Sequence, residues 1–121
     1  MTPFASILAE LEPGCAAFET AVFFDGQGEA IDCHTLLDPY DARLIAAYHV
    51  VLFLSAQARL EWLGAGRTTQ LEIFGAQRES ATVSVGDGYY VTVVVRAGGC
   101  RDELLARLAL VAERLREEAG L

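Results

Sequence analysis

The chain has 121 residues, enough for one domain built on one hydrophobic core, and its 53% of hydrophobic residues is high enough to suggest association with other chains. Seventeen acidic side chains against nine arginines and no lysine give a formal net charge of −8, which disfavours nucleic acid and anionic membrane surfaces as partners. Because no uninterrupted apolar run has the length of a membrane span, and residues 1–13 lack the basic start of a secretory signal peptide, we expect a cytoplasmic protein without membrane insertion.

The first third of the chain predicts a helix followed by a β-hairpin. Apolar residues recur at helical spacing over 2–11 and stop before Pro13. Residues 16–24 and 29–35 have the pattern of strands, and the sequence DGQG between them is typical of a hairpin turn. Before Arg43 the chain carries eight acidic residues and no basic one. This acidic third is equally consistent with steering a basic protein partner and with keeping an apolar protein soluble.

Residues 38–63 predict one long helix with two apolar faces. Asp38 is placed to cap it, with Pro39 at its first position, and Gly64 follows its last residue. At about 100° per residue, two apolar stripes fall on roughly opposite sides. They consist of Tyr40, Leu44, Ala47, Val51, Leu54, Ala58 and Trp62 on one side, and of Ile45, Leu52, Phe53, Ala56, Leu60 and Leu63 on the other. One stripe suffices to cover the protein's own sheet, so we expect another chain to cover the second.

The last part of the chain predicts three strands and a helix. The strands are expected at 68–74, 81–85 and 89–95, and the tight turn Gly86-Asp87-Gly88 joins the last two. Asp102 is expected to cap the final helix. The apolar stripe of that helix consists of Leu104, Leu105, Leu108, Val111, Ala112 and Leu115. The predicted order is αββαβββα in a single α+β domain over 1–121.

The sequence offers no motif for catalysis or for a bound group. Cys15, Cys33 and Cys100 are an odd number without CxxC spacing, so we expect buried or half-buried free thiols. Cys33 and His34 would point to opposite faces of a strand, which makes a joint metal or nucleophile site improbable. His49 is interpreted as a hydrogen-bonded core or interface histidine rather than a pH-sensitive contact. No phosphate-binding loop or GxSxG segment occurs. We therefore predict a protein that is not an enzyme, with no catalytic residues, no cofactor and no metal.

Several features of the sequence occur together in one domain family. They are the order of elements, the DGQG turn, the segment LDPYDARLIAA at the start of the central helix, and GDGYYVTVVV before the last helix. With these features the whole chain resembles a Roadblock domain of the dynein light chain and gliding-motility type. The resemblance implies a profilin-like, five-stranded antiparallel sheet with the central helix on one face and the terminal helices on the other.

The resemblance also implies a dimer and a class of partner. In such a dimer the third strand pairs with its twofold mate, which would close an edge otherwise open to aggregation. The expected dimer edge consists of Thr69, Gln70, Leu71, Glu72 and Ile73. Family members bind Ras-like small GTPases with the paired central helices, and bacterial members of the MglB type stimulate GTP hydrolysis. The implied protein is a homodimer, or half of a heterodimer with another Roadblock protein, that regulates a Ras-like GTPase or scaffolds a polarity or motility complex.

The predicted partner surface lies on the central helix. It consists of Arg43, Ile45, Ala46, His49, Val50, Phe53, Gln57 and Leu60. Periodicity does not decide which stripe of that helix faces outward. Arg43 and Arg59 are interpreted as solvated or ion-paired side chains rather than as arginine fingers.

Two other classes of protein stay open. An acidic, dimeric chaperone of the type III secretion kind would place three strands before the central helix and two after it, whereas two and then three are predicted here. A ligand-sensing module of the PAS or profilin-like kind would need a cavity lined by several polar groups between sheet and helix. The inward positions of this sequence are expected to be uniformly apolar.

Overall fold

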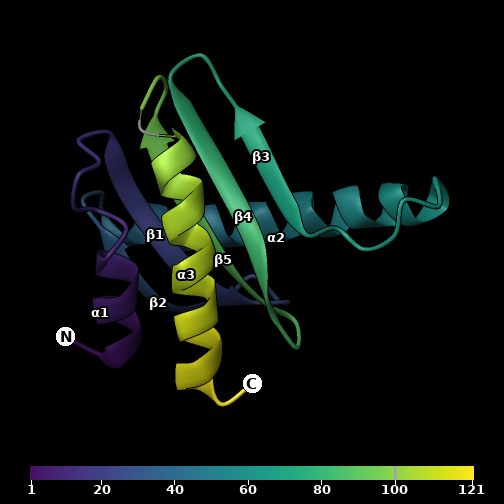
Figure 1. The fold of residues 1–121 in the computed structure, drawn as a ribbon, viewed down its shortest axis with the longest axis horizontal. Coiled ribbons are helices and arrows are strands. Elements are labelled where there is room, and N and C mark those ends of the chain that lie inside the picture. Colours follow the sequence, from purple (N-terminus) through teal and green to yellow (C-terminus); the bar gives the residue numbers. More distant parts are fainter. Residues whose placement is uncertain (100) are drawn as a thin grey trace.

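The computed structural model describes residues 1–99 and 101–121, and within them it contains the predicted helices and strands in the predicted order (Figure 1). The elements are α1 (Pro3–Ala9), β1 (Phe18–Asp25), β2 (Ala30–Thr35), α2 (Pro39–Trp62), β3 (Gln70–Phe74), β4 (Arg78–Gly86), β5 (Tyr89–Arg96) and α3 (Arg101–Ala119). The α+β class and the order αββαβββα are confirmed. None of the described helices is long and apolar enough to span a membrane.

Local signals place most element ends correctly. The side chain of Asp38 accepts a hydrogen bond from the Tyr40 amide at 2.8 Å and caps α2 as predicted. Gly64 follows α2 with a φ of +72°, a conformation that glycine adopts without strain. Helix α3 begins at Arg101, so Asp102 lies in its first turn rather than at the cap. Its carboxylate still interacts favourably with the positive end of the helix dipole there.

The five strands form one antiparallel sheet in the order β2-β1-β5-β4-β3. Helix α2 crosses one face, and α1 and α3 cover the other (Figure 1). Strand β3 is an edge strand, as expected. Strand β4 begins at Arg78, three residues before the predicted start, because residues 78–80 also pair with the end of β5. Two strands precede α2 and three follow it, which is not the arrangement expected of a secretion chaperone.

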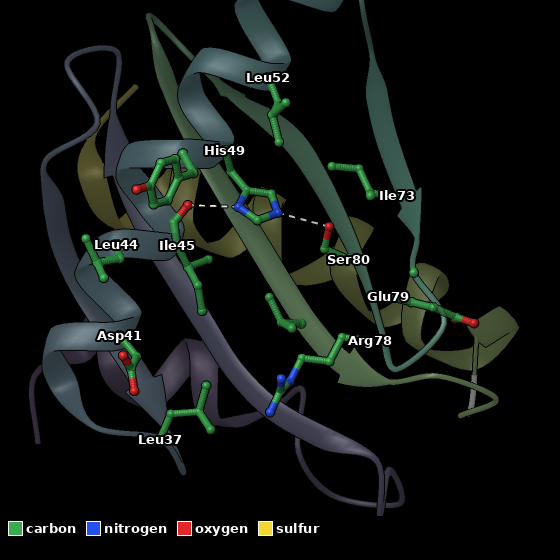
Figure 2. Close-up of a pocket in the computed structure, with 13 residues that line it drawn as sticks. Leu37, Asp41, Leu44, Ile45, His49, Leu52, Ile73, Arg78, Glu79 and Ser80 are labelled. Atoms are coloured by element: carbon green, nitrogen blue, oxygen red, sulfur yellow. Dashed lines mark hydrogen bonds between the residues drawn. The ribbon is translucent and has the colours of Figure 1, made fainter.

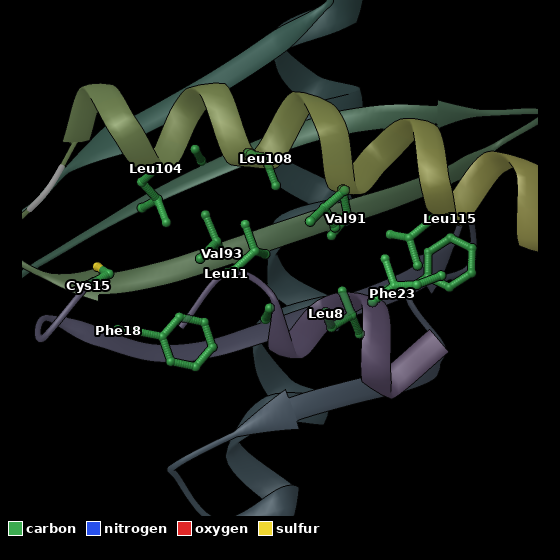
Figure 3. Close-up of a cluster of buried hydrophobic side chains, with 14 of the residues drawn as sticks. Leu8, Leu11, Cys15, Phe18, Phe23, Val91, Val93, Leu104, Leu108 and Leu115 are labelled. Carbon is green, nitrogen blue, oxygen red and sulfur yellow. The ribbon is translucent and has the colours of Figure 1, made fainter. Parts of the chain in front are cut away.

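Each face of the sheet has its own hydrophobic core. The larger core lies beneath α1 and α3 (Figure 3). Leu8 and Leu11 come from the α1 segment, Phe18 and Phe23 from β1, and Leu108 is one of several residues from α3. The stripe predicted for the final helix is confirmed, because its members are buried in this core or packed against it. The smaller core, beneath α2, consists of Val22, Phe24, Ala42, Ala46, Val50, Phe53 and Tyr90.

The cysteines differ from the prediction of three free thiols. Cys33 is free and half-buried, as expected. Cys15 is buried and disulfide-bonded, so the prediction is wrong for this residue. Disulfide formation depends on how closely Cβ atoms approach in the folded chain, which the spacing of cysteines along the sequence does not reveal. The prediction for Cys100 lies outside the described residues.

Candidate functional site

Helix α2 buries only a narrow stripe against its own sheet. Ala42, Ala46, Val50 and Phe53 are buried, and they succeed one another at helical spacing. The small side chains of Ala42 and Ala46 have no exposed surface, so the helix approaches the sheet closely there. The ring of Phe53 contacts that of Tyr90, with 4.9 Å between their centroids. Of the described residues of α2, these four are the only ones that are buried against the chain's own sheet.

The rest of α2 exposes apolar side chains. Among the described residues, the exposed large apolar residues of the helix and its C-cap are Tyr40, Tyr48, Val51, Leu52, Leu54, Trp62 and Leu63. Trp62 keeps 85% of its surface exposed. In Figure 1 the C-terminal end of α2 projects beyond the edge strand β3. An apolar surface of this extent on one helix is typical of an interaction site.

Of the eight residues predicted as a partner surface, five are at least partly exposed and three are buried. Arg43 is exposed, and the partly exposed members are Ile45, His49, Gln57 and Leu60. Ala46, Val50 and Phe53 are buried against the sheet, so their inclusion in a partner surface is corrected. The exposed apolar face lies about half a turn away from them. Of the four buried residues only Phe53 belongs to one of the two predicted stripes, so neither stripe as predicted is the one that meets the sheet. The pair of alanines four residues apart is the signal that could have located the buried stripe.

A groove separates α2 from the β3–β4 side of the sheet (Figure 2). Its volume is about 580 Å³. It exists because α2 packs on β1 and β2, and less on β5, while β4 and β3 extend the sheet beyond it. The side chains that line it are Leu37, Asp41, Leu44, Ile45, Tyr48, His49, Leu52, Ile73, Arg78, Glu79, Ser80 and Val94. Charged and hydroxyl groups are among them, so the expectation of uniformly apolar inward positions is wrong.

His49 connects α2 to β4 across this groove (Figure 2). Its Nδ1 lies 2.8 Å from the carbonyl oxygen of Ile45, and its Nε2 lies 2.9 Å from the hydroxyl oxygen of Ser80. Burial lowers the pKa of His49 below its ordinary value, with a smaller opposing effect from the Ile45 carbonyl. In the neutral ring Nδ1 donates to the carbonyl, since a carbonyl only accepts, and Nε2 accepts from Ser80. The interpretation of His49 as a hydrogen-bonded histidine is confirmed.

Arg78, one of the residues that line the groove, forms an ion pair. The Nε atom of Arg78 lies 2.5 Å from Oε1 of Glu19, a buried carboxylate on β1. The hydrogen bond and the charge of Glu19 both raise the pKa of Arg78 above its ordinary value. The guanidinium therefore stays charged, and the ion pair joins the start of β4 to β1 across β5.

Strand β3 has the features expected of an edge that another chain could extend. One of its sides pairs with β4, and the described residues place no strand against the other. Leu71 packs against the core beneath α2, and Ile73 lines the groove. Glu72 lies on the opposite face, where its carboxylate forms an ion pair with Arg101, and Nη2 of Arg101 lies 2.8 Å from Oε1 of Glu72. The predicted dimer edge of Thr69 and β3 up to Ile73 is thus accessible to another chain.

The side chains of Cys33 and His34 point to opposite faces of β2, as predicted. Cys33 packs against the core beneath α2, whereas the ring of His34 stacks on Phe18 at 5.5 Å and lies 2.7 Å from a Glu12 carboxylate oxygen. Burial, together with the neighbouring Asp32 carboxylate, raises the pKa of the Cys33 thiol. Within the described residues, no three His, Cys, Asp or Glu side chains gather as metal ligands would.

Solved structures resemble the whole chain. A Roadblock/LC7 domain from Streptomyces avermitilis superposes with a TM-score of 0.89 at 18% identity, covering 97% of this chain and 98% of that one. A structure described as MglB with a tetrameric arrangement gives 0.86 at 18% identity, with coverages of 100% and 94%. The gliding protein MglB of Thermus thermophilus gives 0.86 at 16% identity, with coverages of 98% and 89%. No protein-family model and no curated protein matches the sequence. The chain has a Roadblock-type fold.

Proposed function

From the Roadblock-type fold and its uncovered helix, we propose that this chain is a dimeric, non-catalytic interaction module in the cytoplasm of a bacterium. It pairs through β3 with a second copy or with another Roadblock-type chain. The paired α2 helices then dock a Ras-like small GTPase or another component of a polarity or motility complex. The observation that carries the proposal is the exposed apolar face of α2 beside the unpaired edge of β3.

The shape of the monomer supports the proposed dimer. The end of α2 projects beyond β3 (Figure 1). Trp62 is the last residue of this helix, and residues of α2 line the groove, so the groove lies on the same side of the sheet as the helix. If two copies pair antiparallel at β3, each projecting helix end extends over the partner's sheet. That arrangement would cover the β3 side of the groove and part of the exposed stripe at the same time. One of the similar structures is described as tetrameric, which supports self-association of the fold.

The apolar surface that remains outside such a dimer is the proposed GTPase platform. It centres on Tyr48 and Val51, with Arg43 on the same helix. Large aromatic and arginine side chains are the residue types that contribute most to binding energy at protein interfaces. Of the residues first predicted, Arg43, Ile45, His49, Gln57 and Leu60 stay in the proposal. A similar structure is described as a gliding protein, which favours a motility complex.

Light scattering tests the proposal directly. The mass of the purified chain is measured alone and with a Ras-like GTPase of the same organism, loaded with GTP or GDP. We expect a dimer that forms a larger complex in one nucleotide state. A dimer that binds the GTPase in neither nucleotide state would reject the GTPase platform, and the role as a scaffold in a complex would remain. A monomer would reject both the dimer and the platform.

The groove also supports a second candidate, a small-ligand sensor. Its volume of about 580 Å³ and its polar groups at His49, Arg78 and Ser80 would suit a small organic molecule. Mass spectrometry of the purified protein, first native and then denatured, distinguishes the two candidates. A co-purifying small molecule would favour a sensor, whereas an empty dimer favours a groove covered by the partner chain.

The cytoplasmic location is part of the proposal and has its own test. A disulfide at Cys15 is unusual in a reducing compartment. Thiols can be labelled in cells quenched with acid, and the labels counted by mass spectrometry. A reduced Cys15 in such cells would agree with a cytoplasmic protein, whereas an oxidised one would point to another compartment.

A further inference from the structure

A polar pocket lies away from the groove, where the loop after α2 meets the β4–β5 hairpin. Its volume is about 450 Å³. Four parts of the chain contribute side chains: α2, the loop before β3, the β4–β5 hairpin and the last turn of α3. The residues that matter for its chemistry are Gln57, Arg67, Thr68, Ser84, Asp87 and Arg116. Unlike the groove, this pocket is lined mainly by polar groups.

Two guanidinium groups of this pocket are not neutralised by a carboxylate. Among the described residues, Arg67 makes no ion pair or hydrogen bond. Nη1 of Arg116 donates to the Val85 carbonyl at 3.2 Å, and four of the five N–H donors of this guanidinium are left for other partners. Asp87 is the one carboxylate of the lining, and it forms no ion pair in the described part of the chain. The pocket therefore carries a net positive charge in a protein whose net charge is −8.

Thr68 adds a second, independent feature. This residue is 6% exposed, and its Oγ1 atom has no hydrogen-bond partner among the described residues. Buried hydroxyl groups almost always have a partner, because a buried polar group without one destabilises the fold. A ligand in the pocket that Thr68 lines would supply that partner once the buried oxygen turns toward it.

Gly86 allows Arg116 to reach the pocket. Helix α3 lies on the opposite face of the sheet from α2 (Figure 1). The side chain of Arg116, in the last turn of α3, reaches the end of β4, where it donates to the Val85 carbonyl. Gly86 has a φ of +126°, and a Cβ atom at this position would collide with the Arg116 guanidinium. A residue with a side chain would therefore displace the arginine from the hairpin.

We propose that this pocket binds a phosphate-type oxyanion. An oxyanion offers several acceptor atoms to two guanidinium groups, and charge-assisted hydrogen bonds of this kind are the strong ones. The Gln57 amide and the Thr68 hydroxyl add neutral donors, and binding requires Thr68 to turn its oxygen toward the ligand. The two positive charges exclude a cation, and the polar lining disfavours a purely apolar ligand. The proposal does not depend on the GTPase platform.

NMR titration of the full chain with inorganic phosphate tests the proposal, with chloride added to hold the ionic strength constant. We expect saturable shifts of the backbone amides around the pocket. Arg67→Gln is expected to weaken binding about tenfold. Arg59→Gln removes an exposed arginine of α2 outside the pocket and is the matched control, for which we expect unchanged affinity. No saturable shift in the native chain would overturn the proposal, as would equal weakening by both variants.

Two further measurements are needed. The first distinguishes a defined phosphate site from non-specific electrostatic attraction of phosphate to the arginines, and the second identifies the source of the oxyanion. Thr68→Val keeps all charges, so a weaker phosphate affinity in this variant supports a defined site, and an unchanged affinity contradicts the role of Thr68. Inorganic phosphate and a nucleoside monophosphate are then compared in the native chain. Equal affinities assign a free phosphate, whereas tighter binding of the monoester assigns a phosphoryl group carried by a larger molecule. Thermal melts of each variant confirm that it is folded.

Discussion

The two faces of the sheet are covered to different degrees by the chain itself. Beneath α1 and α3 lies a core of aliphatic and aromatic side chains, in which Leu8, Leu11 and Leu108 have no exposed surface. Beneath α2 the core is small, and β4 contributes Ser80 to an open groove. The helix on this second face exposes apolar residues such as Tyr48 and Val51. One face is complete within the monomer, and the other has the properties of a surface that still needs a partner.

The largest effect is expected where the second face would be completed by another copy. Leu71→Arg together with Ile73→Arg places two charges on the proposed dimer edge, and we expect a monomeric or aggregated protein instead of a dimer. Ile31→Arg is the matched control, because Ile31 lies on β2, the other edge strand, and is also partly exposed. Light scattering measures the mass, and circular dichroism the fold. An intact dimer of the double variant would remove β3 from the interface.

The face beneath α3 can be weakened inside the monomer. Leu108 is fully buried in the larger core, so Leu108→Ala should lower the free energy of unfolding by about 3 kcal/mol. Leu110 lies on the same helix and is 67% exposed, so Leu110→Ala should change this free energy by less than about 0.5 kcal/mol. Urea denaturation compares the two variants. Equal losses would contradict the assignment of these two positions to core and surface.

The exposed face of α2 should contribute to binding rather than to stability. Tyr48→Ala combined with Val51→Ala should weaken binding of the partner by about 2 kcal/mol, because large apolar side chains at the centre of an interface contribute most. The free energy of unfolding measured in the monomer should hardly change. Leu110→Ala removes a similarly exposed apolar side chain on the other face and is expected to leave the affinity unchanged. Equal effects of the two changes on affinity would place the partner surface elsewhere.

The pH dependence of stability tests the buried histidine that joins the two sides of the groove. Burial lowers the pKa of His49 in the folded state below 6.5, its ordinary value. Between these two values the unfolded chain binds a proton that the folded chain does not, so stability falls as the pH decreases through this window. His49→Gln should remove this component of the pH dependence. Urea denaturation at a series of pH values measures it, and an identical profile in the variant would contradict a lowered pKa. Asp41 and Glu79 are the carboxylates that line the same groove.

The order of elements could be predicted from the sequence because the signals that set it are local. Asp38-Pro39 at the start of α2 and the Asp87-Gly88 turn between β4 and β5 act through the backbone of their nearest neighbours. The edge position of β3 was also predicted, but from a resemblance and not from the residues of β3 alone.

The geometry of the sites could not be predicted in the same way, because it depends on residues far apart in sequence. Which stripe of α2 meets the sheet depends on how closely Ala42 and Ala46 let the helix approach it. The hydrogen bond between His49 and Ser80 joins residues 31 positions apart. The pocket around Thr68 draws on four separate parts of the chain, and neither its charge nor its buried hydroxyl is visible in any one segment.

The smallest expected effect concerns the contact between the two sides of the groove. Ser80→Ala removes the hydroxyl that lies 2.9 Å from Nε2 of His49, and we expect the free energy of unfolding to fall by about 1 kcal/mol. Ser84→Ala is the matched control, because Ser84 is on the same strand and is exposed. Ser80→Ala should also leave Nε2 of the His49 ring without a hydrogen-bond partner and thereby alter its 15N chemical shift in NMR spectra. Equal effects of Ser80→Ala and Ser84→Ala on stability, with unchanged shifts of the ring nitrogens, would contradict this prediction. Helix α2 would then be held over the sheet by its buried stripe of Ala42, Ala46, Val50 and Phe53. The groove would then be free to widen when a partner helix enters it.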